Sequence, residues 1–290
     1  MEEEKDNRPL VKDLLEKHAS QLVELRNILE KEESYSKDHY DNLWMLRFLL
    51  SHKKVSKASA AAISTMNFRK DRKINELGDI RHKMIDHLEA ETSDRNFEIH
   101  RKHMKFCHSP LAIIYALPDP DRGLIQILTP KYMDQENFVK EISLEETVEV
   151  TLYGNEIIFQ VLDDITRRTG KLTKLLRITD LTDYALKDVN LEYLKRHSAA
   201  TKALEDHYPG LLGSSIVNNP PTWCNATWKV IKHLFPKRVQ ERVAFVSPNK
   251  NPKDAKCFLK YVVRENLWEK FGGNNPEWPP ASPSQLWKGK

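Results

Sequence analysis

The spacing of apolar positions predicts helices over the first ninety residues of the chain. Residues 10–31 (LVKDLLEKHASQLVELRNILEK) place leucine and isoleucine at intervals of three and four, which is the period of an amphipathic helix. After a polar break the same period returns in 42–53, in 55–74, where Ser56 is expected to be the N-cap, and in 81–91. Because no alternating pattern intervenes, we expect this part to be a small bundle of helices.

From Pro110 onward, short apolar runs alternate with helical segments. The runs at 110–117 and 124–129 flank PDPDRG, whose proline, aspartate and glycine favour a turn, so we expect a hairpin. A long helix is expected over 141–169, with Gly170 as its stop. The next segments read strand, helix, strand, helix and strand: 174–181, 188–208, 214–219, 222–235 and 242–246. Strands separated by helices predict an α/β fold with a mostly parallel sheet.

The last part of the chain predicts one more helix and a tail. Residues 255–271 (AKCFLKYVVRENLWEKF) repeat the helical period and are followed by Gly272, a typical helix stop. Beyond them, NNPEWPPASPSQLWKGK is rich in proline and is expected to be extended.

Charge, cysteine content and the length of the apolar runs exclude several classes of protein. A net charge of +4 is too small to indicate a nucleic-acid partner. Three cysteines, Cys107, Cys224 and Cys257, are odd in number and far apart, which argues against a disulfide framework and against a thiolate zinc site. The longest apolar run, LAIIYALP, is far shorter than the roughly 20 residues of a membrane span. We therefore expect a soluble, cytoplasmic, monomeric protein.

Two groups of residues could carry chemistry, and each has a simpler interpretation. In HRKHMKFCH, His100, His103 and Cys107 could share one helical face with His108 beside them and hold zinc, or they could be surface histidines of a basic stretch. Asp180 stands with Asp183 at the end of a predicted strand, where α/β proteins often bind ligands, but a turn or N-cap carboxylate is the alternative. The glycine-rich phosphate loop, the Gly-x-Ser-x-Gly elbow and His-Glu-x-x-His are absent, so we expect neither catalysis nor a metal.

The segment NNPPTWCNATWKVIKHLF, residues 218–235, has more apolar surface than docking on a core requires. On a helical wheel its apolar positions, counted with small residues, fill an arc of about 200°, whereas a surface helix needs about 100°. The large ones are Trp223, Trp228, Val230, Ile231, Leu234 and Phe235. Part of this surface is expected to face an internal apolar cavity or a bilayer, and the alternative is a helix buried on several sides.

Basic residues lie on and just beyond this segment. Lys229, Lys232, Lys237 and Arg238 fall within ten residues, and Arg242 follows shortly after. Each cation near an anionic lipid surface contributes about 1 kcal/mol to binding, so the first four are expected to dock transiently on anionic membranes. A solvated polar face is the alternative.

Three stretches of the chain resemble the CRAL-TRIO lipid-binding family, typified by the yeast phosphatidylinositol and phosphatidylcholine transfer protein. They are NLWMLRFLLSHKKVSKASAAAISTMNFRKD, DHYPGLLGSSIVNNPPTWCNATWKVIKHLFPKRVQERVAFV and ENLWEKFGG, and the similarity extends over about residues 35–275. The resemblance implies a helical N-terminal lobe packed on an α/β domain that forms a lipid cavity under a gating helix near 222–235. The implied divisions are an N-terminal helix and tail, the helical lobe, the lipid-binding domain and a proline-rich tail: 1–34, 35–92, 93–275 and 276–290.

The resemblance implies a protein that binds and transfers one hydrophobic ligand, a phospholipid or another hydrophobic small molecule, with no cofactor besides that lipid. Arg242 and Lys53, with His52, match cationic headgroup positions, and Arg177 falls where phosphatidylcholine binders carry a hydroxyl residue. The gating helix would contact lipid chains through its apolar side chains: Trp223, Trp228, Ile231, Leu234 and Phe235.

Some positions depart from the family pattern. Gly210 stands where phosphatidylinositol binders carry glutamate, and Val239 stands where they carry threonine, so the inositol-reading groups are missing. The principal alternative function is a signalling or scaffold module that is recruited to membranes and carries no cargo.

Overall fold

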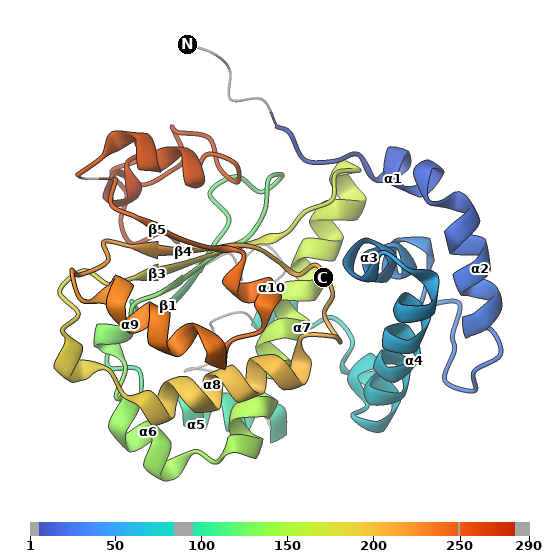
Figure 1. Cartoon of the computed structure of the whole chain (residues 1–290), viewed down its shortest axis with the longest axis horizontal. Helices are drawn as coiled ribbons and strands as arrows, with labels where there is room; N and C mark the ends of the chain where they lie inside the picture. Colours follow the sequence, from blue (N-terminus) through green and yellow to red (C-terminus); the bar gives the residue numbers. More distant parts are fainter. Residues whose placement is uncertain (1–5, 84–94, 249, 282–290) are drawn as a thin grey trace.

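The computed structural model describes residues 6–83, 95–248 and 250–281 (Figure 1). The chain begins with helices that form a group beside the sheet: α1 (Val11–Lys17), α2 (Ala19–Leu29), α3 (Asn42–His52) and α4 (Val55–Asp71), followed by the 3-10 turns η1 (Ile74–Leu77) and η2 (Arg81–Lys83). Apolar side chains of α2, α3 and α4 bury one another in a core of their own, which reaches α7 through Phe159. The predicted bundle of helices is therefore present.

The second part of the chain is a five-stranded sheet with helices. The helices are α5 (Arg95–Met104), α6 (Gln135–Glu141), α7 (Leu144–Thr169), α8 (Leu191–Leu204), α9 (Cys224–Ile231) and α10 (Lys237–Gln240). The strands are β1 (Ile113–Ala116), β2 (Ile125–Leu128), β3 (Leu175–Asp180), β4 (Leu212–Asn218) and β5 (Val243–Val246). The remaining turns are η4 (Pro130–Tyr132), η5 (Leu186–Asp188), η6 (Lys232–Leu234), η7 (Pro252–Cys257) and η8 (Glu269–Phe271).

The strands lie side by side in chain order, and this order decides which face of the sheet the helices cover. β1 and β2 form the predicted antiparallel hairpin, and β2 to β5 are parallel. Successive crossovers that advance in one direction, all right-handed, place their helices on one face. In Figure 1, α8 and α9 lie below the sheet, and α7 runs down past its right-hand end toward α8. The opposite face therefore needs a different cover.

The segment after β5 supplies that cover. Phe258, Leu267, Trp268 and Phe271 are almost fully buried against the sheet residues that point away from the helices. Trp278 packs on this cluster with ring centroids 5.6 Å from both Trp268 and Phe271. The described beginning of the predicted tail thus packs on the protein, and residues 282–290 lie outside the described part of the chain.

Some predicted elements differ from those observed. The predicted helix 255–271 is wrong, because turns and the short helices η7 and η8 occupy this segment. The helix expected over 10–31 is two helices that meet at His18, and α4 begins one residue before Ser56, with Lys54 as its N-cap. Gly170 ends α7 in the left-handed conformation, as predicted. Of the helix expected at 81–91, only the turn η2 lies in the described part.

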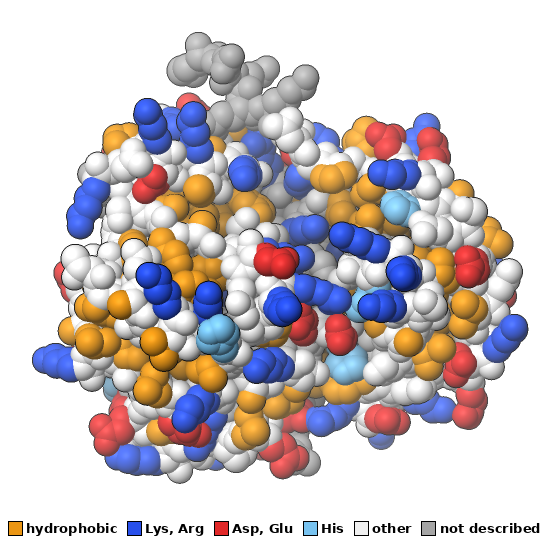
Figure 2. All heavy atoms as spheres, in the orientation of Figure 1, with side chains coloured by type: hydrophobic (Ala, Val, Ile, Leu, Met, Phe, Trp, Pro, Cys, Tyr) orange, Lys and Arg blue, Asp and Glu red, His pale blue; other side chains and the backbone are white. Residues whose placement is uncertain are grey.

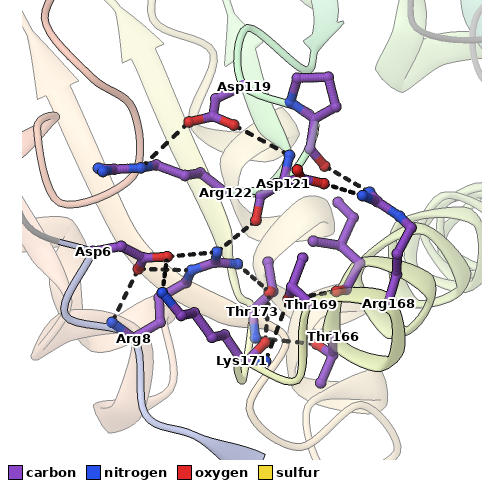
Figure 3. A network of polar contacts seen from close by, with 12 residues as sticks. Asp6, Arg8, Asp119, Asp121, Arg122, Thr166, Arg168, Thr169, Lys171 and Thr173 are labelled. Carbon is purple, nitrogen blue, oxygen red and sulfur yellow. Dashed lines mark hydrogen bonds and ion pairs between the residues drawn. The ribbon is translucent and has the colours of Figure 1, made fainter.

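The N-terminal segment is fastened to the sheet by a polar network (Figure 3). Arg8 donates to the Thr173 hydroxyl at 2.6 Å and to the Asp121 carbonyl, and it pairs with Asp6 at 2.8 Å. Lys171 pairs with the same Asp6 carboxylate at 2.8 Å. These hydrogen bonds, above all those from Arg8, hold the pKa of Asp6 well below its usual range. The start of the chain is thereby joined to the β1–β2 loop and to the α7–β3 junction.

Candidate lipid-binding cavity

A cavity of about 440 Å³ lies between the sheet and the helices α7, α8 and α9. Small-molecule sites in proteins are commonly about 300–1,000 Å³ and mostly apolar, with few polar groups. The side chains around this cavity are mostly hydrophobic and aromatic. Its size and its lining both suit a hydrophobic guest with a small polar part.

One face of the sheet forms a wall of the cavity. Alternate residues of a strand point to opposite faces, and Leu175, Arg177 and Thr179 of β3 line the cavity, whereas Leu176 and Ile178 belong to the core on the other face. The same alternation gives the cavity two residues from each other strand: Ile113, Tyr115, Gln126, Leu128, Ser215, Val217, Val243 and Phe245. Leu212, at the start of β4, adds a third from that strand. The cavity therefore spans the width of the sheet.

Helix α9 closes the cavity with its aromatic side. Trp228 lies between Phe235 and Phe245, with ring centroids 5.7 and 5.9 Å away, and Trp223 lies 6.3 Å from Tyr184. Within α9, which the structure describes in full, Cys224 is the single buried residue. The helix thus covers the cavity while most of its residues keep contact with solvent or with the cavity itself.

The sequence around α9 explains why this helix is short and separate from β4 and α10. Pro220 and Pro221 prevent β4 from continuing into the helix, and Pro236 follows η6 and ends the helical stretch. At the end of β4, Asn218 donates to Asp180 at 3.1 Å, which fixes the point where the chain leaves the sheet. At the other end, the Ser198 hydroxyl of α8 donates to the Leu234 carbonyl.

Charged side chains gather where α10 meets the ends of α3 and α8. Arg238 lies 3.3 Å from an Asp206 oxygen, 4.0 Å from Glu205 and 3.3 Å from the His52 ring nitrogen Nδ1. Burial, followed by the charge of Arg238, lowers the pKa of His52. Figure 2 shows Lys and Arg side chains where the N-terminal helices meet the rest of the chain.

The predicted ligand-binding residues divide into two groups. Six of the nine line the cavity: Arg177, Trp223, Trp228, Ile231, Phe235 and Arg242. The other three, His52, Lys53 and Leu234, are not part of the described lining, and Lys53 is exposed at the end of α3. Arg242 donates to the Leu212 carbonyl at 2.5 Å.

The four predicted membrane-docking residues also differ in position. Lys229 and Lys237 are exposed, Lys232 is half-buried, and Arg238 is half-buried among the acidic residues described above. Val230 is 76% exposed, which makes it the most exposed large hydrophobic residue of the described chain. Over α9 and α10, Figure 2 shows hydrophobic side chains among lysines and arginines.

Sequence reasoning missed several polar residues of the lining. Tyr115 and Gln126 come from the hairpin, and Tyr193 and His197 come from α8. The alternation within β1 and β2 could have assigned the first two to one face. The pairing of that face with α8 depends on the tertiary fold, and no local pattern contains it.

The residues considered for chemistry have structural roles or remain outside a site. Asp180 is 1% exposed, accepts from the Thr182 hydroxyl at 2.7 Å, and pairs with Lys270 at 2.7 Å. Burial alone would raise the pKa of Asp180, but the contacts with Lys270 and Thr182 outweigh it and the pKa is lowered. Asp183 pairs with Lys131 at the surface. Asp180 therefore joins the end of β3 to the C-terminal segment.

The proposed zinc ligands do not form a cluster among the residues whose placement is described. No group of three or more histidine, cysteine or acidic residues there could hold a metal ion. His103 packs edge-on against Phe138, and burial raises the pKa of Cys107 to about 11. The side chain of His100 lies outside the described residues.

The chain thus combines a helical lobe, a mixed sheet beside it, and a cavity between that sheet and a covering helix. This combination is the architecture of a class of lipid-binding proteins. The model of the CRAL/TRIO domain matches residues 110–273, and the chain belongs to this family. The family binds lipids and other small hydrophobic ligands.

Individual relatives agree with this assignment. The chain is 24% identical over 253 residues to the CRAL-TRIO domain-containing protein F28H7.8 of Caenorhabditis elegans, which covers 82% of this chain and 54% of that protein. It is 28% identical over 74 residues to Patellin-5 of Arabidopsis thaliana, which covers 26% of this chain and 11% of that protein. The chain thus spans about half the length, or less, of these curated relatives.

A solved structure shares the fold. The crystal structure of Sfh5 superposes with a TM-score of 0.51 at 10% sequence identity and covers 84% of this chain and 82% of that one. The helices in the described part of the chain are all too short or too polar to cross a bilayer.

Proposed function

We propose that the protein is a lipid carrier that binds one amphiphilic ligand in the cavity and exchanges it at membranes when α9 moves. The cavity between the sheet and α9 is the observation that supports this proposal most strongly. Its walls are mainly apolar, and transfer of hydrocarbon from water into such walls is worth about 0.8 kcal/mol for each CH₂ group. A sixteen-carbon chain would therefore gain about 13 kcal/mol, which is enough to hold it during passage through water.

Helix α9 is the element proposed to move. Prolines precede α9 and follow η6, so the chain is interrupted on both sides of this helical stretch. Cys224 is the one buried residue of α9, and displacement of the helix would therefore expose little of the core. Its inner side presents Trp223, Trp228 and Ile231 to the cavity, and its outer side presents Val230 and Lys229 to solvent. Such a helix can exchange its contacts with cargo for contacts with a bilayer, because both are apolar.

Native mass spectrometry of the protein purified from cells, together with lipid extraction, tests the proposal. A carrier is expected to retain one lipid per chain and to move labelled lipid between vesicles. A recruitment module of the same fold would retain no lipid and would take up none from vesicles, although it could still bind them. That result would contradict the carrier function.

A further inference from the structure

One row of polar side chains crosses the cavity face of the sheet. The register pairs Tyr115 with Gln126, Gln126 with Arg177, and Arg177 with Ser215, so four neighbouring strands each contribute one residue to the row. All four residues line the cavity. A parallel strand covered on both faces is normally apolar throughout, which makes an arginine in the middle of β3 an exception in need of a reason.

Arg177 is held in place by a chain of neutral hydrogen bonds. Its Nε donates to the Gln126 side-chain oxygen at 2.7 Å, and the Gln126 amide donates to the Tyr115 hydroxyl at 2.9 Å. Among the residues that the structure describes, no carboxylate forms an ion pair with Arg177, and its two terminal nitrogens donate to no protein acceptor. The guanidinium is therefore oriented, while the nitrogens that face the cavity are available.

The two arginines that are most deeply buried in the described part of the chain are neutralised. Arg47 pairs with Asp163 at 3.0 Å, and Arg69 pairs with Glu156 at 2.8 Å. A buried charge without a partner is costly, and the guanidinium of arginine cannot give up its proton to avoid that cost. Burial accordingly lowers the pKa of Arg177, and the Tyr115 hydroxyl opposes this effect without cancelling it, since no carboxylate contributes. The missing counter-charge is one that a ligand in the cavity can bring.

The opposite wall adds neutral polar groups. His197 and Tyr193 of α8 also line the cavity, with ring centroids 4.3 Å apart, and Nε2 of His197 is a buried atom without a hydrogen-bond partner. Burial, and then the charge of Arg177, lowers the pKa of His197 to about 4, so this imidazole is neutral near pH 7. The subsite thus carries one positive charge, which matches one negative charge on a ligand.

One acidic residue, Glu205, is among the described lining residues, and it is paired with a different arginine. Glu205 lies 4.0 Å from Arg238 at the meeting point of α8 and α10. On the sheet, Leu128, Thr179 and Val217 flank the polar row on one side and Leu175 flanks it on the other. Beyond the row, a polar group at Arg177 would therefore have mostly apolar neighbours, with the Thr179 hydroxyl as the exception.

We propose that Arg177 binds the oxyanion of a mono-anionic amphiphile inside the cavity, with His197 and Tyr193 beside it and the hydrocarbon along the apolar walls. The guanidinium fork suits two-point contact with either a carboxylate or a phosphodiester. This inference rests on the proposed carrier function and adds the charge of the cargo and the place of its head group. It places that charge at the middle of the sheet, apart from the basic residues near α10.

Binding of matched probes to wild-type protein and to Arg177→Met tests the inference. The probes are hexadecanoate, hexadecan-1-ol and vesicles of phosphatidylglycerol, which present a carboxylate, a neutral hydroxyl and a phosphodiester. Wild type is expected to bind hexadecanoate or to extract phosphatidylglycerol about ten- to a hundredfold more tightly than Arg177→Met does, and the better of the two identifies the source of the oxyanion. Hexadecan-1-ol should bind both proteins equally.

The thermal stability of the ligand-free proteins separates ligand binding from a structural role. Arg177→Met removes an unneutralised charge and one hydrogen bond to Gln126, two effects of opposite sign, so its Tm should lie close to that of wild type, whereas a structural arginine would leave a clearly lower Tm. Equal binding of the anionic probes to both proteins would overturn the Arg177 subsite alone, since hexadecan-1-ol would still report a working cavity. Failure of every probe to bind wild type would overturn the carrier function and the subsite together.

Discussion

Arg69 of α4 and Glu156 of α7 form a two-point ion pair that joins the N-terminal helices to the sheet-containing part of the chain. Arg69 Nη1 lies 2.8 Å from Glu156 Oε2, and Nη2 lies 3.0 Å from Oε1. The Tyr208 hydroxyl donates to the same carboxylate at 2.9 Å, and the Asn75 side-chain oxygen accepts from Arg69 Nε at 2.7 Å. Both ions are therefore neutralised and hydrogen-bonded in the interior.

Glu156→Gln should lower the free energy of unfolding by about 3–5 kcal/mol, because it keeps the shape of the side chain but leaves Arg69 as an uncompensated buried charge. Denaturant unfolding at constant m-value measures this effect. Arg69→Met together with Glu156→Leu removes both charges and should recover much of the loss. If the loss of stability in the double variant equalled the summed losses of Arg69→Met alone and Glu156→Leu alone, the two residues would not be coupled.

The second prediction uses the two sides of α9. Ile231 lines the cavity and Val230 is 76% exposed, although they are adjacent in the sequence. Ile231→Asp places a carboxylate among apolar groups, so retained lipid should fall at least about tenfold. Val230→Asp is the matched control and should keep its lipid. Quantitative lipid extraction of both purified proteins measures the difference, and equal lipid content would contradict the assignment of α9 as the cover of the cavity.

The architecture followed from the sequence wherever a local pattern sufficed. Short apolar runs gave the hairpin and β3 to β5, the glycine at 170 ended α7, and the apolar arc of 222–235 located the helix that covers the cavity. These features depend on residues that are close together in the sequence, because backbone conformation and side-chain direction set them locally.

The C-terminal segment shows where local patterns mislead. Phe258, Val262, Leu267 and Phe271 recur at intervals close to helical ones, yet turns bring them onto the same sheet face and bury them completely. Tertiary packing therefore produced a helical period without a helix. Arg177 is the converse case, because its position in β3 could be read from the sequence, but the absence of a carboxylate partner among the described residues could not.

The third prediction concerns membrane docking. Lys229 of α9 and Lys237 of α10 are exposed, and each cation near an anionic surface contributes about 1 kcal/mol. Changing both to glutamine should weaken binding to anionic vesicles by about 2 kcal/mol, or roughly 30-fold, and should leave binding to neutral vesicles unchanged. Lys202→Gln, at an exposed position of α8, is the control. Co-sedimentation with vesicles measures binding, and an equal loss from the control would refute a docking surface at α9 and α10.

The fourth prediction is a dependence of stability on pH that arises from His197. The folded-state pKa of His197 is lowered to about 4, below the value of 6.5 of an exposed histidine. Between these two values the unfolded chain binds a proton that the folded chain does not, so stability falls as the pH falls through this window. The full effect of a shift of this size is about 3 kcal/mol, present as added stability near pH 7 and lost by pH 4.

His197→Phe should flatten this dependence, because phenylalanine can retain the ring contacts with Phe138 and Tyr193 and carries no titrating group. Some dependence should remain, since burial also lowers the pKa of His207. Denaturant unfolding of ligand-free protein between pH 4 and pH 7 provides the measurement, and His233→Asn, at an exposed position near α9, serves as the control. If wild type and His197→Phe lose the same stability over that range, His197 is not buried in its neutral form and the wall opposite Arg177 differs from the one described.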